Sequence, residues 1–246
     1  MDATKYHNSE SEQARTADLS RIVPKDCRKA LEIGARDGFF SRILAQHFSE
    51  VTALDLEQPN FQIPGVVPVA GDVTRLDFPD ESFDCVVCTE VLEHIPKLQQ
   101  AADEISRVAR QAVVVGVPYR QDIRLGRTTC ASCGRANPPW GHVNSFEEAR
   151  LRALFNRLEP AETSFIWQNA QKTNAVSAWL MDRAGNPWGT YDQDEPCVHC
   201  GASLGRPATM SIPQRVMASG AHRLRRLQCL AVRPCPNWIH MVFRKR

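Results

Sequence analysis

The sequence predicts an α/β fold built on a doubly wound, mostly parallel sheet, and three observations carry this prediction. Short apolar stretches alternate with helical stretches along most of the 246 residues, which is the pattern of repeated strand–helix–strand units. A glycine turn follows the first apolar stretch, as is typical where a helix begins against a ligand. The hydrophobic content of 43% is enough to bury one core and to carry an additional module.

The elements follow in order along the chain. An amphipathic helix over residues 11–22 is expected to precede the sheet. Ser145 is the predicted N-cap of a later helix, with Glu148 completing a capping box. Strands are expected near 29–34, 51–55, 66–70, 83–89, 111–118, 161–167 and 238–244, and helices near 38–48, 98–109 and 146–157.

Two insertions interrupt this pattern. About seventy residues separate the last two predicted strands, and a shorter insertion follows the strand at 111–118. Such stretches are too long for simple connections inside one sheet and predict added structure. The expected organisation is a core with its N-terminal helix at 1–125, a first insertion at 126–145, more core at 146–170, a second insertion at 171–235 and a final core strand at 236–246.

The stretch from Leu31 to Asp55 predicts a nucleotide-binding unit. A short strand leads through Glu32 into a turn with Gly34 and Gly38, a helix follows, and the second strand ends in Asp55. Glycines let a backbone approach a ligand at the start of a helix, and a carboxylate at the end of the second strand can accept hydrogen bonds from a ribose diol. The nicotinamide fingerprint needs a different glycine spacing from the one present here.

Four motifs in order resemble class I S-adenosylmethionine (SAM)-dependent methyltransferases. The turn resembles the family motif with an acid two residues before its first glycine, and Asp55 stands at the ribose-binding acid. Gly71-Asp72-Val73 is similar to the adenine loop, and residues 83–95 (FDCVVCTEVLEHI) resemble the fourth strand and its loop in small-molecule methyltransferases. The resemblance implies a seven-stranded Rossmann-like sheet whose last strand is antiparallel, and SAM as cofactor.

The resemblance also assigns residues to the cofactor. One departure is that Arg36 occupies the middle glycine of the first motif, where its side chain either turns away or reaches the methionine carboxylate. Tyr6 or Arg15 of the N-terminal region would help to close over the cofactor. The residues expected to bind SAM are Glu32, Gly34, Arg36, Gly38, Asp55, Leu56, Asp72, Val73 and Thr89.

The two insertions carry a predicted structural zinc site. Cys130-Ala131-Ser132-Cys133-Gly134 lies in the first, and Cys197-Val198-His199-Cys200-Gly201 in the second. Two such C-x-x-C-G turns can supply four thiolates in a tetrahedron, which would staple the insertions into one lid. Free thiols or a redox role are the alternatives, and a site filled by four cysteines leaves no open position for catalysis.

A second C-x-x-C pair has a different interpretation. Cys85 and Cys88 lie on a predicted strand, where residues three apart point to opposite faces. We therefore expect them to be small buried hydrophobic residues rather than metal ligands.

The acceptor chemistry is expected after the fourth and fifth strands, where Thr89, Glu90, Glu93, Tyr119 and Arg120 stand. Methyl transfer from SAM to a hydroxyl or an amine needs proximity and a general base.

Two histidines are the predicted catalytic residues. His142, beside Trp140 in the first insertion, is the preferred base, and His94 is the second candidate. A purely structural role remains the alternative for each of them.

Charge is distributed unevenly along the chain. Residues 196–246 contain nine Lys or Arg and no Asp or Glu, whereas the rest has 21 basic against 28 acidic residues. The segment 214–230 reads as a basic helix. It is either a solvated face or arm, or a contact for an anionic substrate, an acidic membrane surface or RNA.

The resulting prediction is a zinc-stapled SAM-dependent methyltransferase acting on a small molecule, most simply at a hydroxyl oxygen of a secondary metabolite or sugar. The acceptor could be anionic. An RNA methyltransferase is one alternative, although Asn137-Pro138-Pro139-Trp140 stands after the wrong strand for the nucleic-acid signature it matches. A non-catalytic zinc-containing binding protein is the other. No apolar run is long enough for a membrane span, and a cytoplasmic location is expected.

Overall fold

A computed structural model describes residues 8–169, 172–193 and 195–246. The chain folds into two compact units. The core unit comprises His7–Tyr119, Phe146–Trp167 and Pro236–Arg246, and the insertion unit includes Arg120–Ser145 and Gln168–Cys235. Each unit is described by itself below.

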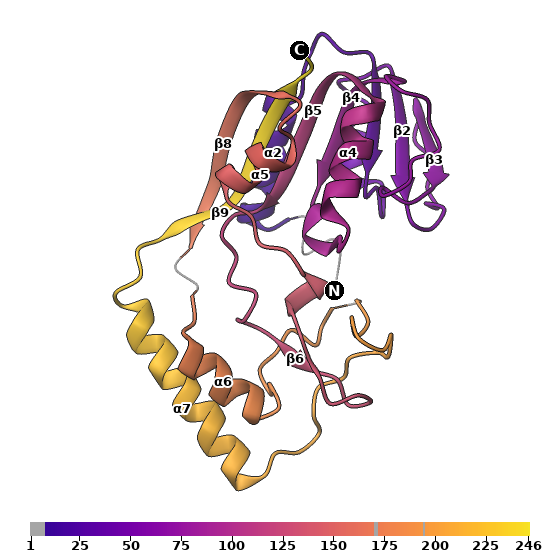
Figure 1. Cartoon of the computed structure of the whole chain (residues 1–246). Coiled ribbons are helices and arrows are strands. Elements are labelled where there is room, and N and C mark those ends of the chain that lie inside the picture. Colours follow the sequence, from indigo (N-terminus) through magenta and orange to yellow (C-terminus); the bar gives the residue numbers. More distant parts are fainter. Residues whose placement is uncertain (1–7, 170–171, 194) are drawn as a thin grey trace. The chain divides into compact units, whose positions relative to one another are not determined.

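A seven-stranded sheet forms the centre of the core unit (Figure 1). Its order is β3-β2-β1-β4-β5-β9-β8, so the first crossover series runs outward from β1 and the second begins at β4. The strands β1 to β5 pair in parallel, and β9 pairs antiparallel with β5. The bounds are β1 Lys29–Ile33, β2 Glu50–Asp55, β3 Val66–Ala70, β4 Phe83–Thr89, β5 Ala109–Pro118, β8 Glu159–Asn169 and β9 Cys235–Arg244.

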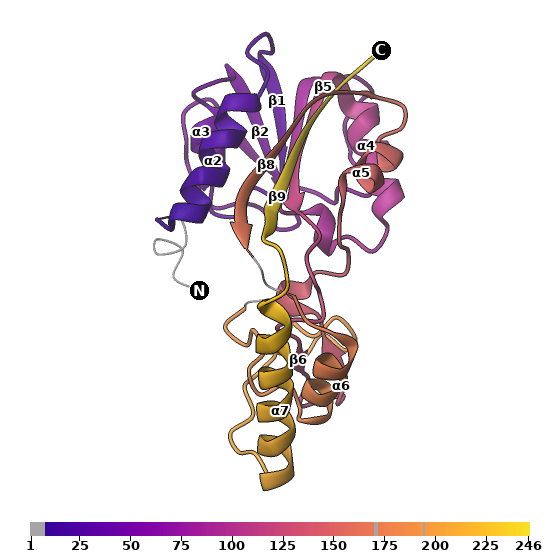
Figure 2. The same ribbon diagram turned by 90° about the vertical axis from the view of Figure 1, so that its left-hand side faces the viewer.

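Helices cover both faces of this sheet, as Figure 2 shows with the strands between them. Leu19 and Leu44 are buried in one apolar cluster, to which α2 and α3 contribute, and Ile105 and Leu151 in another, to which α4 and α5 contribute. A parallel sheet needs both faces covered because its strands are apolar on both sides. The bounds are α2 Glu10–Ile22, α3 Phe39–Leu44, η1 Leu92–His94, α4 Leu98–Val108 and α5 Glu148–Leu154.

The predicted doubly wound, seven-stranded sheet is confirmed, as is the antiparallel final strand. Cys85 and Cys88 are buried on β4, as expected for small hydrophobic residues. The predicted helix over 38–48 is too long. It ends at Leu44 because the next turns are tighter, with the Gln46 and His47 N–H groups donating to carbonyls three residues back.

The predicted capping box at Ser145 is wrong. Helix α5 begins at Glu148, and Glu147 in extended backbone is its N-cap. Ser145 instead donates its hydroxyl to the Gln121 carbonyl at 2.9 Å. The Glu148 carboxylate pairs with Arg152 one turn along the helix at 2.7 Å. The local sequence matched a capping box, but the Ser145 hydroxyl forms a longer-range hydrogen bond to Gln121 instead.

Two helices and a short hairpin make up most of the regular structure of the insertion unit. Helix α7 (Ile212–Cys229) has a capping box between Ser211 and Gln214 and packs against α6 (Ala175–Arg183). The hairpin joins β6 (Thr128–Thr129) to β7 (Ala136–Asn137), and a short helical turn, η2, covers Pro139–Gly141. Over the described residues, we find no helix whose length and apolarity would let it cross a bilayer.

Candidate cofactor site and metal centre

The predicted cofactor residues gather along one edge of the core sheet. Residues at the carboxyl ends of adjacent parallel strands share an edge, and this is where ligands bind in open α/β sheets. The residues are Glu32 on β1, Gly34, Arg36 and Gly38 in the turn after it, Asp55 and Leu56 at the end of β2, Asp72 and Val73 after β3, and Thr89 at the end of β4.

Asp55 fixes the glycine turn to the neighbouring strand. One carboxylate oxygen accepts the Arg36 N–H at 2.8 Å and the other accepts the Leu56 N–H at 2.7 Å. Each oxygen has a second lone pair, so the group can still accept hydrogen bonds from a diol. Leu56 beside it is 72% exposed.

The two glycines of the turn are needed for packing as well as conformation. Gly34 has φ of 85°, and a Cβ added there would stand 2.3 Å from the Val91 side chain. Gly38 caps α3 with φ of 76°, and a Cβ would press on the Phe61 ring. Arg36 adopts the left-handed region too, with φ of 42°, which directs its N–H at Asp55. The exposed arginine thus reproduces the backbone that a glycine would supply.

Glu32 is the most perturbed of the predicted cofactor residues. It is 3% exposed and accepts a hydrogen bond from the Ser41 hydroxyl. Burial raises the pKa of Glu32 to about 8, and the Asp55 and Asp37 carboxylates add to the shift while the Ser41 bond opposes it. A carboxyl held neutral near pH 7 ionises readily when a positive charge arrives beside it.

The loop after β3 is organised by Asp72. Its carboxylate accepts the Thr74 N–H at 2.8 Å and the Thr74 hydroxyl at 2.9 Å, which closes a tight turn. Val73 is 4% exposed and packs in the core. The valine side chain is therefore committed to the core, and the groups it could offer a ligand are those of its backbone.

Two buried carboxyl groups follow β4. Glu90 has φ of 56°, and one of its oxygens accepts the Trp238 indole N–H at 3.2 Å. Glu93 is fully buried, and neither of its oxygens finds a partner within the described part of the chain. Burial, together with the nearby Glu90 carboxyl, raises the pKa of Glu93 well above its usual range. Buried acceptors of this kind can receive donors from a ligand or hold a proton.

A contact that no sequence pattern predicted joins α2 to β9. His240 on β9 is fully buried, and its Nδ1 lies 2.7 Å from the Asp18 carboxylate on α2. Burial lowers the pKa of His240, so the neutral ring donates from Nδ1. An α-carbon substituent on Gly116 would touch both this ring and Thr89, which puts His240 beside a predicted cofactor residue. The only feature of the sequence that could have pointed to this contact is a histidine, His240, within an otherwise apolar strand.

The remaining predicted site residues, Arg15 and the two candidate bases, lie in different parts of the fold. Arg15 forms a buried ion pair with Glu12 on its own helix, and Tyr6 falls outside the described residues. His94 ends the short helix η1 in the core unit. His142 belongs to the insertion unit, is 8% exposed, and contacts the Gln121 amide oxygen through Nδ1 at 2.6 Å. An amide oxygen only accepts, so Nδ1 carries the proton and the lone pair of the neutral ring is on Nε2.

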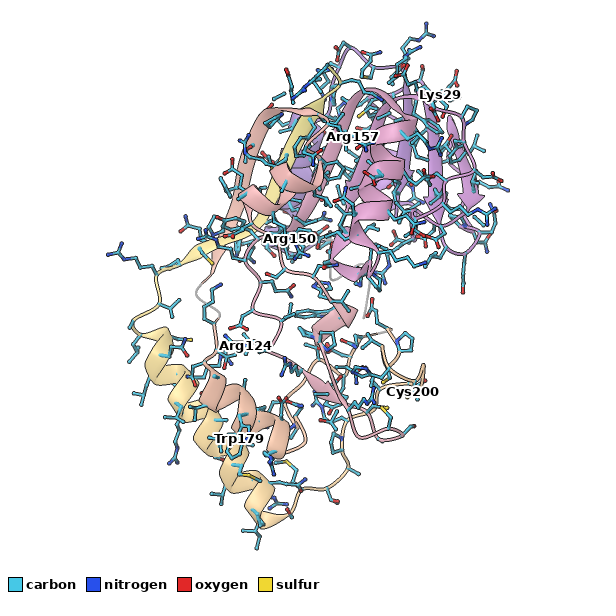
Figure 3. All side chains as sticks on the ribbon, viewed as in Figure 1. Lys29, Arg124, Arg150, Arg157, Trp179 and Cys200 are labelled. Atoms are coloured by element: carbon cyan, nitrogen blue, oxygen red, sulfur yellow. The ribbon has the colours of Figure 1, made fainter. Side chains whose placement is uncertain are left out.

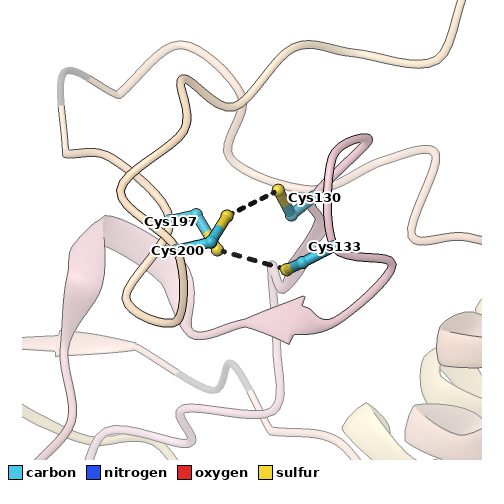
Figure 4. A group of neighbouring side chains, drawn as sticks. All are labelled: Cys130, Cys133, Cys197 and Cys200. Carbon is cyan, nitrogen blue, oxygen red and sulfur yellow. Dashed lines mark hydrogen bonds between the residues drawn. The ribbon is translucent and has the colours of Figure 1, made fainter.

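The four cysteines of the two insertions meet, as Figure 4 shows. Cys130 and Cys200 sulfurs are 3.7 Å apart, as are those of Cys133 and Cys197, and all four sulfurs lie within 4.8 Å of one another. A tetrahedral zinc ion with Zn–S bonds of about 2.3 Å places its sulfurs about 3.8 Å apart. The cluster therefore fits a zinc ion in donor type, number and spacing.

The two cysteine turns have the same backbone design. The N–H of the first cysteine donates to the carbonyl five residues on, from Cys130 to Arg135 and from Cys197 to Ala202. The glycine after each pair, with φ near 70°, donates back to the first cysteine. Hydrogen bonds from the backbone N–H groups of Cys133 and Ser132 lower the pKa of Cys130, as a metal-binding thiolate requires.

Asn137 ties the turns together without a metal. It is 1% exposed, its amide oxygen accepts the Val198 N–H at 2.9 Å, and its NH2 donates to the Arg135 carbonyl at 3.1 Å. The Ala136 carbonyl lies 3.2 Å from the His199 ring. Asn137, the first residue of the Asn-Pro-Pro-Trp string, is thus hydrogen-bonded to both cysteine turns.

The doubly wound sheet is the Rossmann-like fold of methyltransferases, and comparison with known proteins supports a methyltransferase domain. Residues 31–115 match the family described as "Methyltransferase domain". The chain is 33% identical over 170 residues to the demethylmenaquinone methyltransferase of Roseiflexus castenholzii, covering 64% of this chain and 66% of that protein.

Two solved structures share the fold. The YcgJ protein of Bacillus subtilis is 15% identical with a TM-score of 0.57, over 95% of this chain and 99% of that one. The N-methyltransferase NodS of Bradyrhizobium japonicum, in complex with S-adenosyl-L-homocysteine, is 16% identical with a TM-score of 0.55, over 99% and 92% of the two chains.

Residues 31–115 thus match a methyltransferase domain, and the solved structures show that the chain has the fold of class I SAM-dependent methyltransferases. The match spans no more than 66% of the length of the curated relatives compared, among them the sterol 24-C-methyltransferase of Gibberella zeae, of which it spans 29%.

Proposed function

We propose that this protein transfers a methyl group from SAM to a small-molecule acceptor, at a hydroxyl oxygen of a secondary metabolite or sugar. The observation that carries the proposal is the Asp55 carboxylate, fixed by two backbone N–H groups at the end of β2 beside the glycine turn. This arrangement suits a ribose diol, and the matched domain and fold support SAM as the nucleoside-containing ligand.

SAM, when bound, supplies a methyl group already activated by its sulfonium sulfur. The residues of the edge would bind and orient it. Asp55 would accept hydrogen bonds from the ribose hydroxyls, and exposed Leu56 would cover the adenine. The backbone after Asp72 would contact the adenine edge. Buried Glu32 and Thr89 would lie towards the methionine part, where a cationic ligand favours the ionised form of Glu32.

His142 is the proposed general base for the acceptor hydroxyl, with His94 as the second candidate. Support for His142 comes from its contact with the Gln121 amide oxygen, because that oxygen accepts from Nδ1 and so leaves Nε2 as the ring nitrogen that can act as a base. A base with its lone pair on Nε2 can take the hydroxyl proton as the oxygen attacks the methyl group. The expected result for His142→Asn is a large loss of kcat with SAM affinity kept.

An anionic acceptor is part of the proposal. The insertion unit contains a cavity of about 210 Å³ whose lining includes Arg124, Arg127 and Arg225. Arg124 and Arg127 pair with Asp122 and Asp182, whereas Arg225 has no ion pair within the described ranges. One uncompensated cation beside a cavity favours a ligand with a single phosphate or carboxylate group.

A zinc ion held by Cys130, Cys133, Cys197 and Cys200 is the proposed metal centre. Its support is the spacing of the sulfurs and the backbone N–H groups directed at them. Because cysteine fills all the ligand positions, the role of the ion would be structural. It would bind the two insertions, which are separated by more than sixty residues of sequence, into one folded unit.

Isothermal titration of the zinc-loaded protein with SAM and S-adenosylhomocysteine tests the proposal. We expect binding by the wild type and a loss of about tenfold or more for Asp55→Asn, since one oxygen of a charged acceptor is replaced by a donor. Asp77→Asn, an exposed aspartate outside the site, is the matched control and should bind like the wild type. Folded, zinc-loaded protein that binds neither ligand would overturn the enzyme assignment and favour a binding protein.

A further inference from the structure

Helix α7 has an outward face that mixes apolar and basic side chains. Four large apolar residues along it are strongly exposed: Ile212 at 77%, Val216 at 67%, Leu227 at 66% and Leu230, just after the helix, at 86%. Their positions follow helical spacing, so they form a row along one side. The opposite side is occupied by small residues, with Ala218 and Ala221 buried.

Arginines stand beside this row. Arg215, Arg223 and Arg226 are all exposed, and none of them pairs with a carboxylate among the residues described. The surrounding sequence offers no compensation, because residues 196–246 contain no Asp or Glu. An exposed apolar row flanked by unpaired cations is unusual for a helix that only faces water.

The neighbouring helix α6 adds exposed apolar surface of its own. Trp179, labelled in Figure 3, is 55% exposed, and Val176 one turn earlier is 58% exposed. The Arg183 guanidinium lies 5.3 Å from the centroid of the Trp179 indole. Tryptophan beside arginine is typical of side chains that sit at a lipid headgroup region, where one end is apolar and the other wet.

We propose that the outward face of α7 binds the surface of an anionic phospholipid bilayer, with the helix lying in the plane of the headgroups. The apolar row would enter the boundary between headgroups and acyl chains, and the arginine stems would lie along it while their guanidinium groups contact lipid phosphates. RNA is a poorer match, because α7 carries no Phe, Tyr or Trp on which bases could stack.

Vesicle co-sedimentation of the full chain tests this proposal. Vesicles contain either phosphatidylcholine alone or phosphatidylcholine with about a third phosphatidylglycerol. We expect binding to the anionic vesicles that weakens with salt, and little to the neutral ones. The triple variant Arg215→Gln, Arg223→Gln and Arg226→Gln should lose about a hundredfold in partitioning, since each basic residue near such a surface is worth about fivefold.

Two further variants keep the test specific. Leu227→Ser with Leu230→Ser leaves the charge unchanged and should lower partitioning at least tenfold, because it removes apolar area that enters the boundary. The matched control is Arg28→Gln, Arg42→Gln and Arg157→Gln, which removes the same charge from exposed positions in the core unit. Circular dichroism would show that every variant is folded.

Three results would overturn the proposal. The first is equal sedimentation with both kinds of vesicle, and the second is a control triple that loses as much as the α7 triple. The third is a protein that does not bind anionic vesicles but binds an RNA duplex in a salt-dependent way, with this binding lost in the α7 triple variant. That result would assign the same face to nucleic acid.

Discussion

Replacing Glu32 by glutamine should stabilise the protein, because the buried carboxyl opposes folding. Burial raises the pKa of Glu32 to about 8 from an ordinary value of 4.5. Between these values the folded protein binds a proton that the unfolded chain has released, so the free energy of unfolding falls as the pH rises. Each pKa unit corresponds to about 1.36 kcal/mol.

The size of the effect follows from these pKa values. Below pH 4.5 Glu32 is protonated in both states and costs nothing. The cost is about 1 kcal/mol at pH 5 and about 4 kcal/mol at pH 8, where ionisation of the folded form begins to limit it. Glutamine keeps an oxygen that can accept the Ser41 hydroxyl and has no charge to lose. Glu32→Gln should therefore gain about these amounts at the two pH values.

Urea unfolding of the zinc-loaded protein at pH 5 and pH 8, followed by far-UV circular dichroism, measures the difference. Glu104→Gln is a control of opposite sign. The Arg107 guanidinium holds the pKa of Glu104 below its usual range, so this ion pair stabilises the fold above that range and its contribution is lost as the pH falls through it. A Glu32→Gln variant that gains nothing at pH 8, or gains equally at both pH values, would refute the reasoning. The same variant should bind SAM more weakly despite its greater stability.

Three other predictions concern the metal centre and the glycine turn. Cys133→Ser should reduce bound zinc well below one per chain and expose the insertion unit to proteolysis, and metal analysis with limited trypsin digestion would check both. Asn137→Ala should cost about 1–3 kcal/mol, since it removes the acceptor of the Val198 N–H and the donor to the Arg135 carbonyl, and should weaken zinc retention against a chelator. Gly34→Ala should cost about 2–4 kcal/mol in thermal or urea unfolding, from left-handed backbone and collision with Val91.

Much of the core could be predicted because its information is local. The parallel strands of the sheet are short, mostly apolar runs, and the strands found differ from those expected by at most three residues at an end. The cysteine turns were equally local, since the C-x-x-C-G spacing already contains the geometry of each half of the metal centre. The tetrahedral coordination of one zinc ion by four thiolates predicted in addition that the two cysteine turns lie together, and their four sulfurs do so.

The contacts that the sequence did not reveal join residues far apart in the chain. Asp18 and His240 are 222 residues apart, and nothing in either segment marks them as partners. Asn137 begins a string that matches a nucleic-acid methyltransferase signature. Its side chain instead accepts a hydrogen bond from the Val198 N–H, a partner that no sequence pattern identifies. Ser145 had a good local pattern for a cap and was taken by the Gln121 carbonyl instead. Pattern predicts what neighbours in sequence can do, whereas these bonds depend on the assembled fold.

Four exceptions to good local structure lie at the edge where SAM is proposed to bind. Arg36 and Glu90 both hold left-handed backbone without being glycine, at a cost of about 1 kcal/mol or more each. Glu32 and Glu93 are carboxyl groups buried against the preference of their charge. A chain selected for stability alone would replace them. Their presence after β1 and β4 is consistent with a binding site that has a stability cost, because a cationic cofactor would favour the ionised form of the same carboxyl groups.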